Sequence, residues 1–147
     1  MITVVQALIA HLGSVTAVSN LVGERIYGDI PPQGELAAQL VITLDSTEEF
    51  SALGSGSVGV ARSTVEITAR SGLRATSDQA AAAVRAALLA IENETIAASV
   101  SGGLWVNEVE VGESGVESRQ EPPRTADDSW RYHSLQKFKV FHAVPAV

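Results

Sequence analysis

The stretch that most constrains the fold is a glycine-rich segment between two predicted strands. Residues 40–44 form an apolar run, and residues 65–69 alternate apolar and polar side chains with the two-residue period of a strand. Between them, Gly54, Gly56 and Gly59 have the G-x-G-x-x-G spacing of dinucleotide-binding enzymes. That fingerprint requires a helix after the glycines, because the helix N-terminus holds the phosphate. Since a strand follows, we expect a flexible hairpin loop, and a nucleotide-binding enzyme is kept as an alternative.

Apolar side chains at helical spacing predict two main helices. Residues 5–12 carry one such stripe, with Gly13 as the expected C-cap, and a short turn of helix is expected over residues 14–20. Residues 81–91 carry the second stripe, and the S/T-x-x-E/Q pattern of residues 76–79 predicts a capping box at its start. Both stripes are expected to pack against a sheet.

Strand-like patterns fill most of the remaining chain. They cover residues 23–28, 39–46, 60–70, 95–101, 105–111 and 130–144. In the last strand, Phe138 and Val140 lie on one side and Leu135 and Phe141 on the other, so we expect both of its faces to be buried. The order of elements predicts an α+β fold, in which two main helices pack on a mostly antiparallel sheet.

Residues 112–129 form the least regular part of the sequence. They carry many charges and two adjacent prolines but almost no large apolar side chains. Such a segment cannot bury enough apolar surface to offset the entropy of ordering it. We therefore expect a long loop here, of the kind that is often functional.

The composition excludes several classes of protein. A chain of 147 residues is long enough to form a core, so we expect a single domain over residues 1–147. It contains no cysteine, which excludes disulfides and thiolate metal sites. Its net charge of −7 opposes nucleic-acid binding. No apolar run approaches the ~20 residues that span a bilayer, and there is no cationic signal-peptide region, so we expect a soluble protein.

Groups that could carry catalysis are sparse. His133 and His142 lie nine residues apart on one predicted strand, too far to share a metal, and His11 lies on a helix, so all three are interpreted as partly exposed structural side chains. The carboxylate pairs at 48–49 and 127–128 fall in predicted polar loops. No G-x-S-x-G, H-E-x-x-H or P-loop motif occurs. We predict that the protein is not an enzyme and uses no cofactor or metal.

The two tryptophans each begin a predicted strand. Trp105 and Trp130 are expected to pack in the core, because large aromatic side chains usually do. The alternative is that one of them anchors an interface, where tryptophan is also enriched.

Four segments carry a resemblance to a known family. They are LIAHLGSVTAVSNLVGERIYGDIPP, VEITARSG, TSDQAAAAVRAALLAIEN and WRYHSLQKFKVFHA. In these the chain resembles the tail-terminator (tail completion, head–tail joining) family of long-tailed bacteriophages, and V-G-E-R-I-Y-G is the most specific part. The match weakens in the loops, since the segment at 112–129 is longer than usual. Members also often carry an aromatic residue near the position of Ala69.

The resemblance implies a ring-forming subunit of the virion, assembled in the host cytoplasm. A homo-hexamer would cap the tail tube, stop tail polymerisation and join the tail to the head. The implied partners are the tail tube protein and the head–tail connector or head-closure protein. DNA would pass through the lumen without specific binding, and no membrane would be involved. Another neck or head-closure adaptor of the same particle is the alternative.

Partner contacts are expected at the hairpin tip, in the long loop and on the last strand. The hydrophobic fraction of 46%, mostly alanine and valine, suits a subunit that buries surface against other chains. The candidate residues are Phe50, Leu53, Gly54 and Gly56 at the hairpin tip (48–59), Arg119, Glu121 and Arg124 in the loop, and Phe141. Phe50 and Leu53 would be the apolar anchors of the tip. The alternative is that the hairpin tip and the long loop are solvated and contact no partner.

Overall fold

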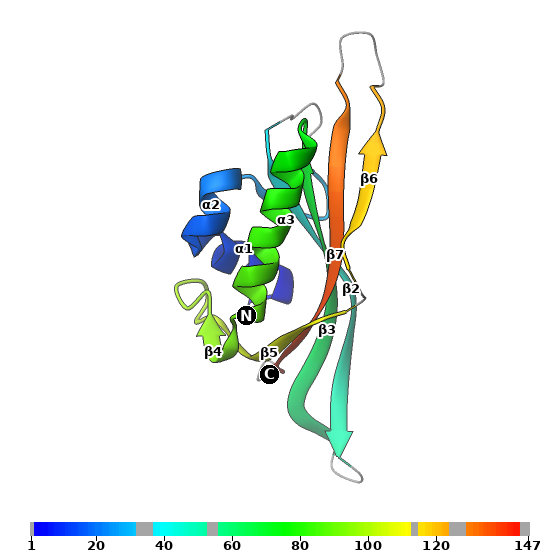
Figure 1. The fold of residues 1–147 in the computed structure, drawn as a ribbon. Coiled ribbons are helices and arrows are strands. Elements are labelled where there is room, and N and C mark those ends of the chain that lie inside the picture. The colour runs from blue at the N-terminus through cyan, green and yellow to red at the C-terminus, as the bar shows by residue number, and fades with distance from the viewer. Residues whose placement is uncertain (1, 32–36, 53–55, 113–114, 124–128, 145–147) are drawn as a thin grey trace.

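In the part of the chain that the structure describes, three helices pack against one face of a single sheet (Figure 1). The computed structural model describes residues 2–31, 37–52, 56–112, 115–123 and 129–144. The helices are α1 (Val4–Ser14), α2 (Thr16–Val22) and α3 (Arg74–Leu89). The strands are β1 (Ile26–Gly28), β2 (Gln39–Ala52), β3 (Gly56–Ser71), β4 (Glu92–Ile96), β5 (Leu104–Val111), β6 (Glu117–Glu121) and β7 (Arg131–Ala143).

The sheet has seven strands in the order β1-β2-β3-β7-β5-β4, and β6 also pairs with β7. β5 and β6 share one edge of β7, with β6 along residues 131–135 and β5 along residues 138–142. β1 runs parallel to β2, and all other pairs are antiparallel. The predicted α+β fold with a mostly antiparallel sheet is therefore confirmed.

The core lies between the sheet and the helices. The predicted stripes on α1 and α3 face it, and Leu8, Leu12, Val84 and Leu88 have no exposed surface. Phe138 of β7 is the largest fully buried side chain. Burying each of these side chains contributes roughly 1.5–3 kcal/mol, so this layer holds the helices on the sheet.

Polar groups lock α3 onto β7 within that layer. Ser134 Oγ donates a hydrogen bond to Asp78 Oδ1 at 2.8 Å and lies 3.1 Å from Ser77 Oγ. Gln136 Nε2 donates to the carbonyl oxygen of Ala81 at 2.8 Å. Because buried hydrogen bonds depend on geometry, they fix the position of α3 along the strand.

The opposite face of the sheet, which we call the helix-free face, is only partly covered. Along β7 the even-numbered side chains from Ser134 to His142 are buried, whereas the odd-numbered ones, including Leu135 and Phe141, are half-exposed. All three helices lie on the other side (Figure 1). The prediction that both faces of the last strand are buried is therefore wrong.

The strands extend further than the sequence pattern predicted. β2 and β3 continue through the predicted loop to Ala52 and from Gly56, so Glu48 and Glu49 lie in a strand. The predicted loop at 112–129 contains β6, which pairs with β7, and the strand predicted over residues 95–101 ends at Ile96. Hydrogen bonds to the neighbouring strands order these polar segments, and the residue pattern within one segment does not reveal which strand it will pair with.

The helix ends also differ from the prediction. The capping box lies at α1, where Gln6 N donates to Thr3 Oγ1 at 3.1 Å and Thr3 N donates to Gln6 Oε1 at 3.0 Å. α3 begins at Arg74 without a side-chain cap, so Thr76 lies inside the helix. Gly13 also lies inside its helix.

No single helix among the described residues has the length and apolar character needed to cross a membrane. Taken together, α1 and α2 would meet that test, but they are bent by 91° where they meet.

Candidate functional site

Two hairpin arms extend from opposite ends of the molecule (Figure 1). The β2–β3 arm comprises residues 46–52 and 56–64, which pair with each other. The β6–β7 arm comprises residues 117–121 paired with residues 131–135. The sequence placed partner contacts in both regions, and the structure puts these regions far apart.

An aromatic cluster marks the base of the β2–β3 arm. The rings of Phe50 and Phe141 stack with centroids 6.3 Å apart and planes 10° apart. The Arg62 guanidinium lies 5.9 Å from the centroid of the Phe50 ring and forms an ion pair with Glu48. The structure thus brings together two residues that the sequence had named separately. Arg62 was not named as a contact residue from the sequence. A signal was present, because Glu48 and Arg62 are nearly the same number of residues from the glycine turn and so face each other in a hairpin.

A chain of hydrogen bonds, buried at Ser63 and His142, supports the same arm from the helix side. Thr47 Oγ1 lies 2.9 Å from Ser63 Oγ, which lies 2.7 Å from His142 Nε2. His142 Nδ1 lies 2.9 Å from the carbonyl oxygen of Ala143, so Nδ1 donates and Nε2 accepts from Ser63. Burial lowers the pKa of His142, which favours this neutral form. His142 is 3% exposed, so its prediction as a partly exposed side chain is wrong.

The Ser63–His142 pair has the spacing of a nucleophile and its general base. Catalysis also needs access for a substrate, and both side chains are buried, Ser63 with no exposed surface. The pair is therefore a structural support of the arm.

An ionic cluster holds the base of the β6–β7 arm. Arg70 Nε donates to His133 Nε2 at 3.3 Å, and Glu121 Oε2 lies 3.7 Å from the Arg70 guanidinium and 3.4 Å from His133 Nε2. Burial and then the neighbouring Arg70 lower the pKa of His133. Arg119 pairs with Glu117 at 2.9 Å on the exposed part of β6. The cluster ties β6 to β3 across β7, a role the sequence did not reveal for Arg70 and His133.

Of the remaining predicted contact residues, Gly56 is the first residue of β3. Leu53, Gly54 and Arg124 lie outside the described residues.

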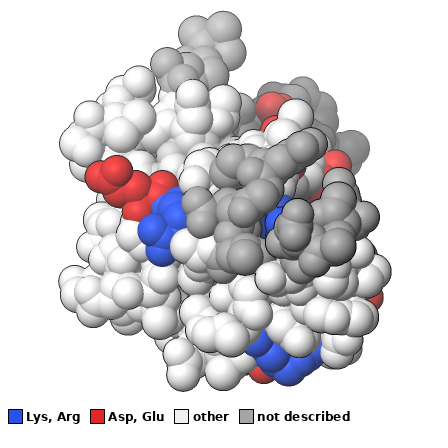
Figure 2. Space-filling view, turned by 90° about the horizontal axis from the view of Figure 1, so that it is seen from above, with Lys and Arg blue, Asp and Glu red and all other residues white. Residues whose placement is uncertain are grey.

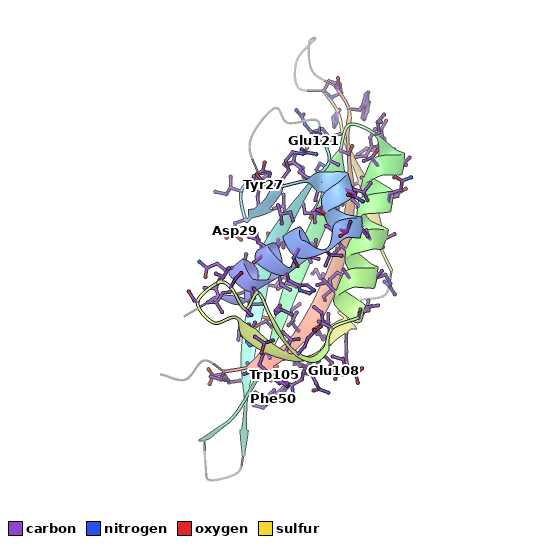
Figure 3. The ribbon with its side chains drawn as sticks, turned by 90° about the vertical axis from the view of Figure 1, so that its left-hand side faces the viewer. Tyr27, Asp29, Phe50, Trp105, Glu108 and Glu121 are labelled. Carbon is purple, nitrogen blue, oxygen red and sulfur yellow. The ribbon has the colours of Figure 1, made fainter. Side chains whose placement is uncertain are left out.

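Both tryptophans lie at the surface, so the prediction that they pack in the core is wrong. Trp105 is 44% exposed and Trp130 is 47% exposed. Trp130 precedes the end of β7 that carries β6, and Trp105 lies on β5 near the other end of β7. Figure 3 shows Trp105 and Phe50 toward one end of the molecule and Glu121 toward the other. Each end therefore presents an exposed tryptophan, a residue typical of interface anchors.

The surroundings of the glycines do not fit a nucleotide site. The residues after Gly56 form β3, and Gly59 lies within that strand with a φ of 82°. The fingerprint requires a helix at this point, so the nucleotide-binding alternative loses its structural basis. Among the described residues, no group of three or more histidine or acidic side chains could hold a metal ion.

Comparison with known proteins gives a consistent assignment. A chain from the virion of a native gene transfer agent particle has a similar fold, with a TM-score of 0.54, 21% identity and 95% of each chain covered. No curated protein sequence matches. The model of the family described as tail completion protein gp17 matches residues 6–116, which is most of the chain. The chain therefore belongs to the tail completion protein gp17 family and is a structural protein of a phage-type tail, located in the virion.

Proposed function

We propose that this chain forms a hexameric ring that caps the tail tube, stops its polymerisation and joins the tail to the head connector. The observation that carries the proposal is the pair of arms at opposite ends of the body (Figure 1). A terminator needs two separate docking surfaces, one for the tube and one for the head side. A subunit with projecting strands and an exposed tryptophan at each end supplies both.

The β2–β3 arm has the properties of a contact element. Its base is fixed by the stacked Phe50 and Phe141, so docking loses little conformational freedom at that point. Phe50 and Phe141 are half-buried in the isolated chain, which leaves apolar surface for a partner. We extend the proposal to Leu53, Gly54 and Gly56 as the tip of the same arm.

The β6–β7 arm forms the second docking element. Glu121 is held by Arg70 and His133, so this arm also starts from an ordered base. Trp130 is the exposed aromatic side chain at this end. We extend the proposal to Arg119 and Arg124 on the same side.

The charge of the molecule suits passage of DNA without capture. Each copy carries a net charge of −7, so a ring repels a polyanion in its lumen. Figure 2 views the molecule from the end of the β6–β7 arm, and the described lysines and arginines visible there form no continuous patch.

The test is the oligomeric state of the purified protein, measured with and without tail tubes from its own particle. We expect light scattering and electron microscopy to find a ring of about six times the 15.4 kDa chain mass, free or at one end of each tube. Tubes bearing the ring should stop growing when tube protein is added. A chain that stays monomeric in both conditions, with tubes that keep growing, would contradict the proposal.

A further inference from the structure

Among the described residues, the sheet has several edges without a second neighbour, and two of them are long polar segments of β2 and β6. β1 covers only residues 40–42 of β2, so among the described residues the outer edge of β2 has no partner from Thr43 onward. Among the same residues, β6 pairs only with β7. Residues 44–49 and 117–120 are exposed, so burial adds little to their stability. Strands held on one side alone are marginal, and a second neighbour would satisfy their outer backbone groups.

We propose that these two edges join neighbouring copies: β6 of one copy pairs antiparallel with residues 43–47 of β2 in the next. One sheet would then run around the ring. This inference rests on the proposed ring and specifies how its subunits bind one another.

Strand direction permits this pairing without turning any copy over. β2, β3, β7 and β6 are antiparallel in succession, so β2 and β6 run in opposite directions. Copies related by rotation about a ring axis keep the same strand directions and the same faces. When β6 lies beside β2 of the next copy, the two strands are antiparallel, and the helix-free faces stay on one side.

The stagger between the two edges also fits a closed sheet. Through the observed registers, Arg119 on β6 lies level with His133, Arg70 and Gln39. Bringing Arg119 opposite Asp45 requires a shift of about six residues, or ~20 Å, across four strand spacings of ~19 Å in total. The strands would then tilt by about 45° from the ring axis, close to the roughly 35–45° of closed barrels. Six copies would close at a diameter of about 50 Å, which leaves a lumen.

β6 and β4 each carry two glutamates, and Arg119 is the basic side chain that favours β6 as the partner. Asp45 lies 3.6 Å from Lys137, whose side chain is on the helix-free face. Arg119 is opposite His133 on that same face, and its side chain is 59% exposed. The two would therefore meet across the new edge, and the exposed pair that Arg119 now makes is cheap to exchange.

β4 offers the wrong charge for the same position. Its outer edge carries Glu92 and Glu94, which would face Asp45, Glu48 and Glu49 of β2. Like charges directly opposite each other destabilise a strand pair. Joining copies through β4 is therefore disfavoured.

The absence of cysteine allows a direct test by disulfide trapping. The double variant Asp45→Cys/Arg119→Cys places one thiol on each proposed edge at the two positions that the register sets opposite each other, and within one chain the two edges lie on opposite sides of β3 and β7. The matched control, Asp45→Cys/Thr95→Cys, places the second thiol on β4 instead. Both are oxidised in the ring state with tail tubes present and run on a denaturing gel, and circular dichroism checks that both are folded.

The expected result is a ladder of covalent oligomers up to the hexamer for the 45/119 variant and monomer for the 45/95 control. A ladder from the control, or no ladder from either variant while light scattering still finds the ring, would overturn this inference and leave the ring itself standing. If the wild-type chain forms no ring on tubes, the proposed function fails and this inference fails with it.

Discussion

Replacing Ser63 with alanine should destabilise the protein by leaving a buried imidazole nitrogen without its donor. Ser63 Oγ lies 2.7 Å from His142 Nε2, and Nδ1 of the same ring is engaged with the carbonyl oxygen of Ala143. Ser63 is 0% exposed and His142 is 3% exposed, so water does not readily replace the lost hydroxyl. An unsatisfied buried acceptor costs about 1–3 kcal/mol of unfolding free energy.

The assay is a thermal melt followed by circular dichroism near neutral pH. A chain of this size loses about 2–4 °C in Tm per kcal/mol, so Ser63→Ala should lower the Tm by roughly 2–12 °C. Ser118→Ala is the matched control, because Ser118 is exposed on β6 and the same change there should stay within about 0.5 kcal/mol.

A double-mutant cycle tests whether the loss arises from the hydrogen bond. When His142→Leu is combined with Ser63→Ala, the acceptor is gone as well, so the two losses should fall short of additive by about 0.5–3 kcal/mol. If Ser63→Ala melts with the wild type, or if the two losses add fully, the hydrogen-bonded chain does not support the arm as we argue.

Three further results are expected. Burial lowers the pKa of all three histidines below 6.5, so near and below that pH the unfolded chain binds more protons than the folded chain, and the folded state loses stability as the pH falls. Thermal melts from about pH 8 to about pH 5 should show a falling Tm, and a Tm that does not change would refute this. Phe50→Ala should weaken retention on tail tubes by about tenfold or more in a co-sedimentation assay, whereas Val116→Ala at the other end should not affect that contact. Asp45→Arg or Arg119→Asp alone should lower the ring fraction in light scattering, and combining them should restore it; a double variant no better than either single one would count against the edge pairing.

Local periodicity was enough to locate the parts of the fold that bury one face. Leu8, Leu12, Val84 and Leu88 lie at helical spacing, and all are fully buried as predicted. The alternation of apolar and polar side chains over residues 65–69 correctly indicated which side of β3 faces the core. These patterns succeed because one apolar face against one core produces a regular spacing in the sequence.

The candidate contact elements were harder to predict because their order comes from neighbours. Residues 47–49 and 117–121 are polar on both faces, so no apolar period identifies them, yet both are strands held by their partners β3 and β7. The stacking of Phe50 on Phe141 likewise depends on the register between β3 and β7, since Arg62 is opposite Phe141. Sequence alone named both phenylalanines but could not place them in contact.

The capping error has a physical explanation as well. The pattern Thr-x-x-Gln occurs at residues 3–6 and again at residues 76–79. The first copy precedes its apolar stripe directly and forms the box, whereas α3 already begins at Arg74, so Thr76 has helical neighbours on both sides. The motif identifies a helix start only where the preceding residues cannot join the helix.

The same charges that keep free strand edges from pairing indiscriminately can direct them to one partner. The acidic side chains along β2 and β4 repel other acidic edges in a chain whose net charge is −7. Arg119 is the one basic residue on β4, β6 or the described outer edge of β2 from Thr43 to Phe50. Repulsion between whole subunits is screened over about 8 Å at physiological salt, whereas a contact across one strand spacing is shorter than that distance. The proposed contact between Asp45 on β2 and Arg119 on β6 can therefore still select its partner at a salt concentration that screens the repulsion between whole subunits.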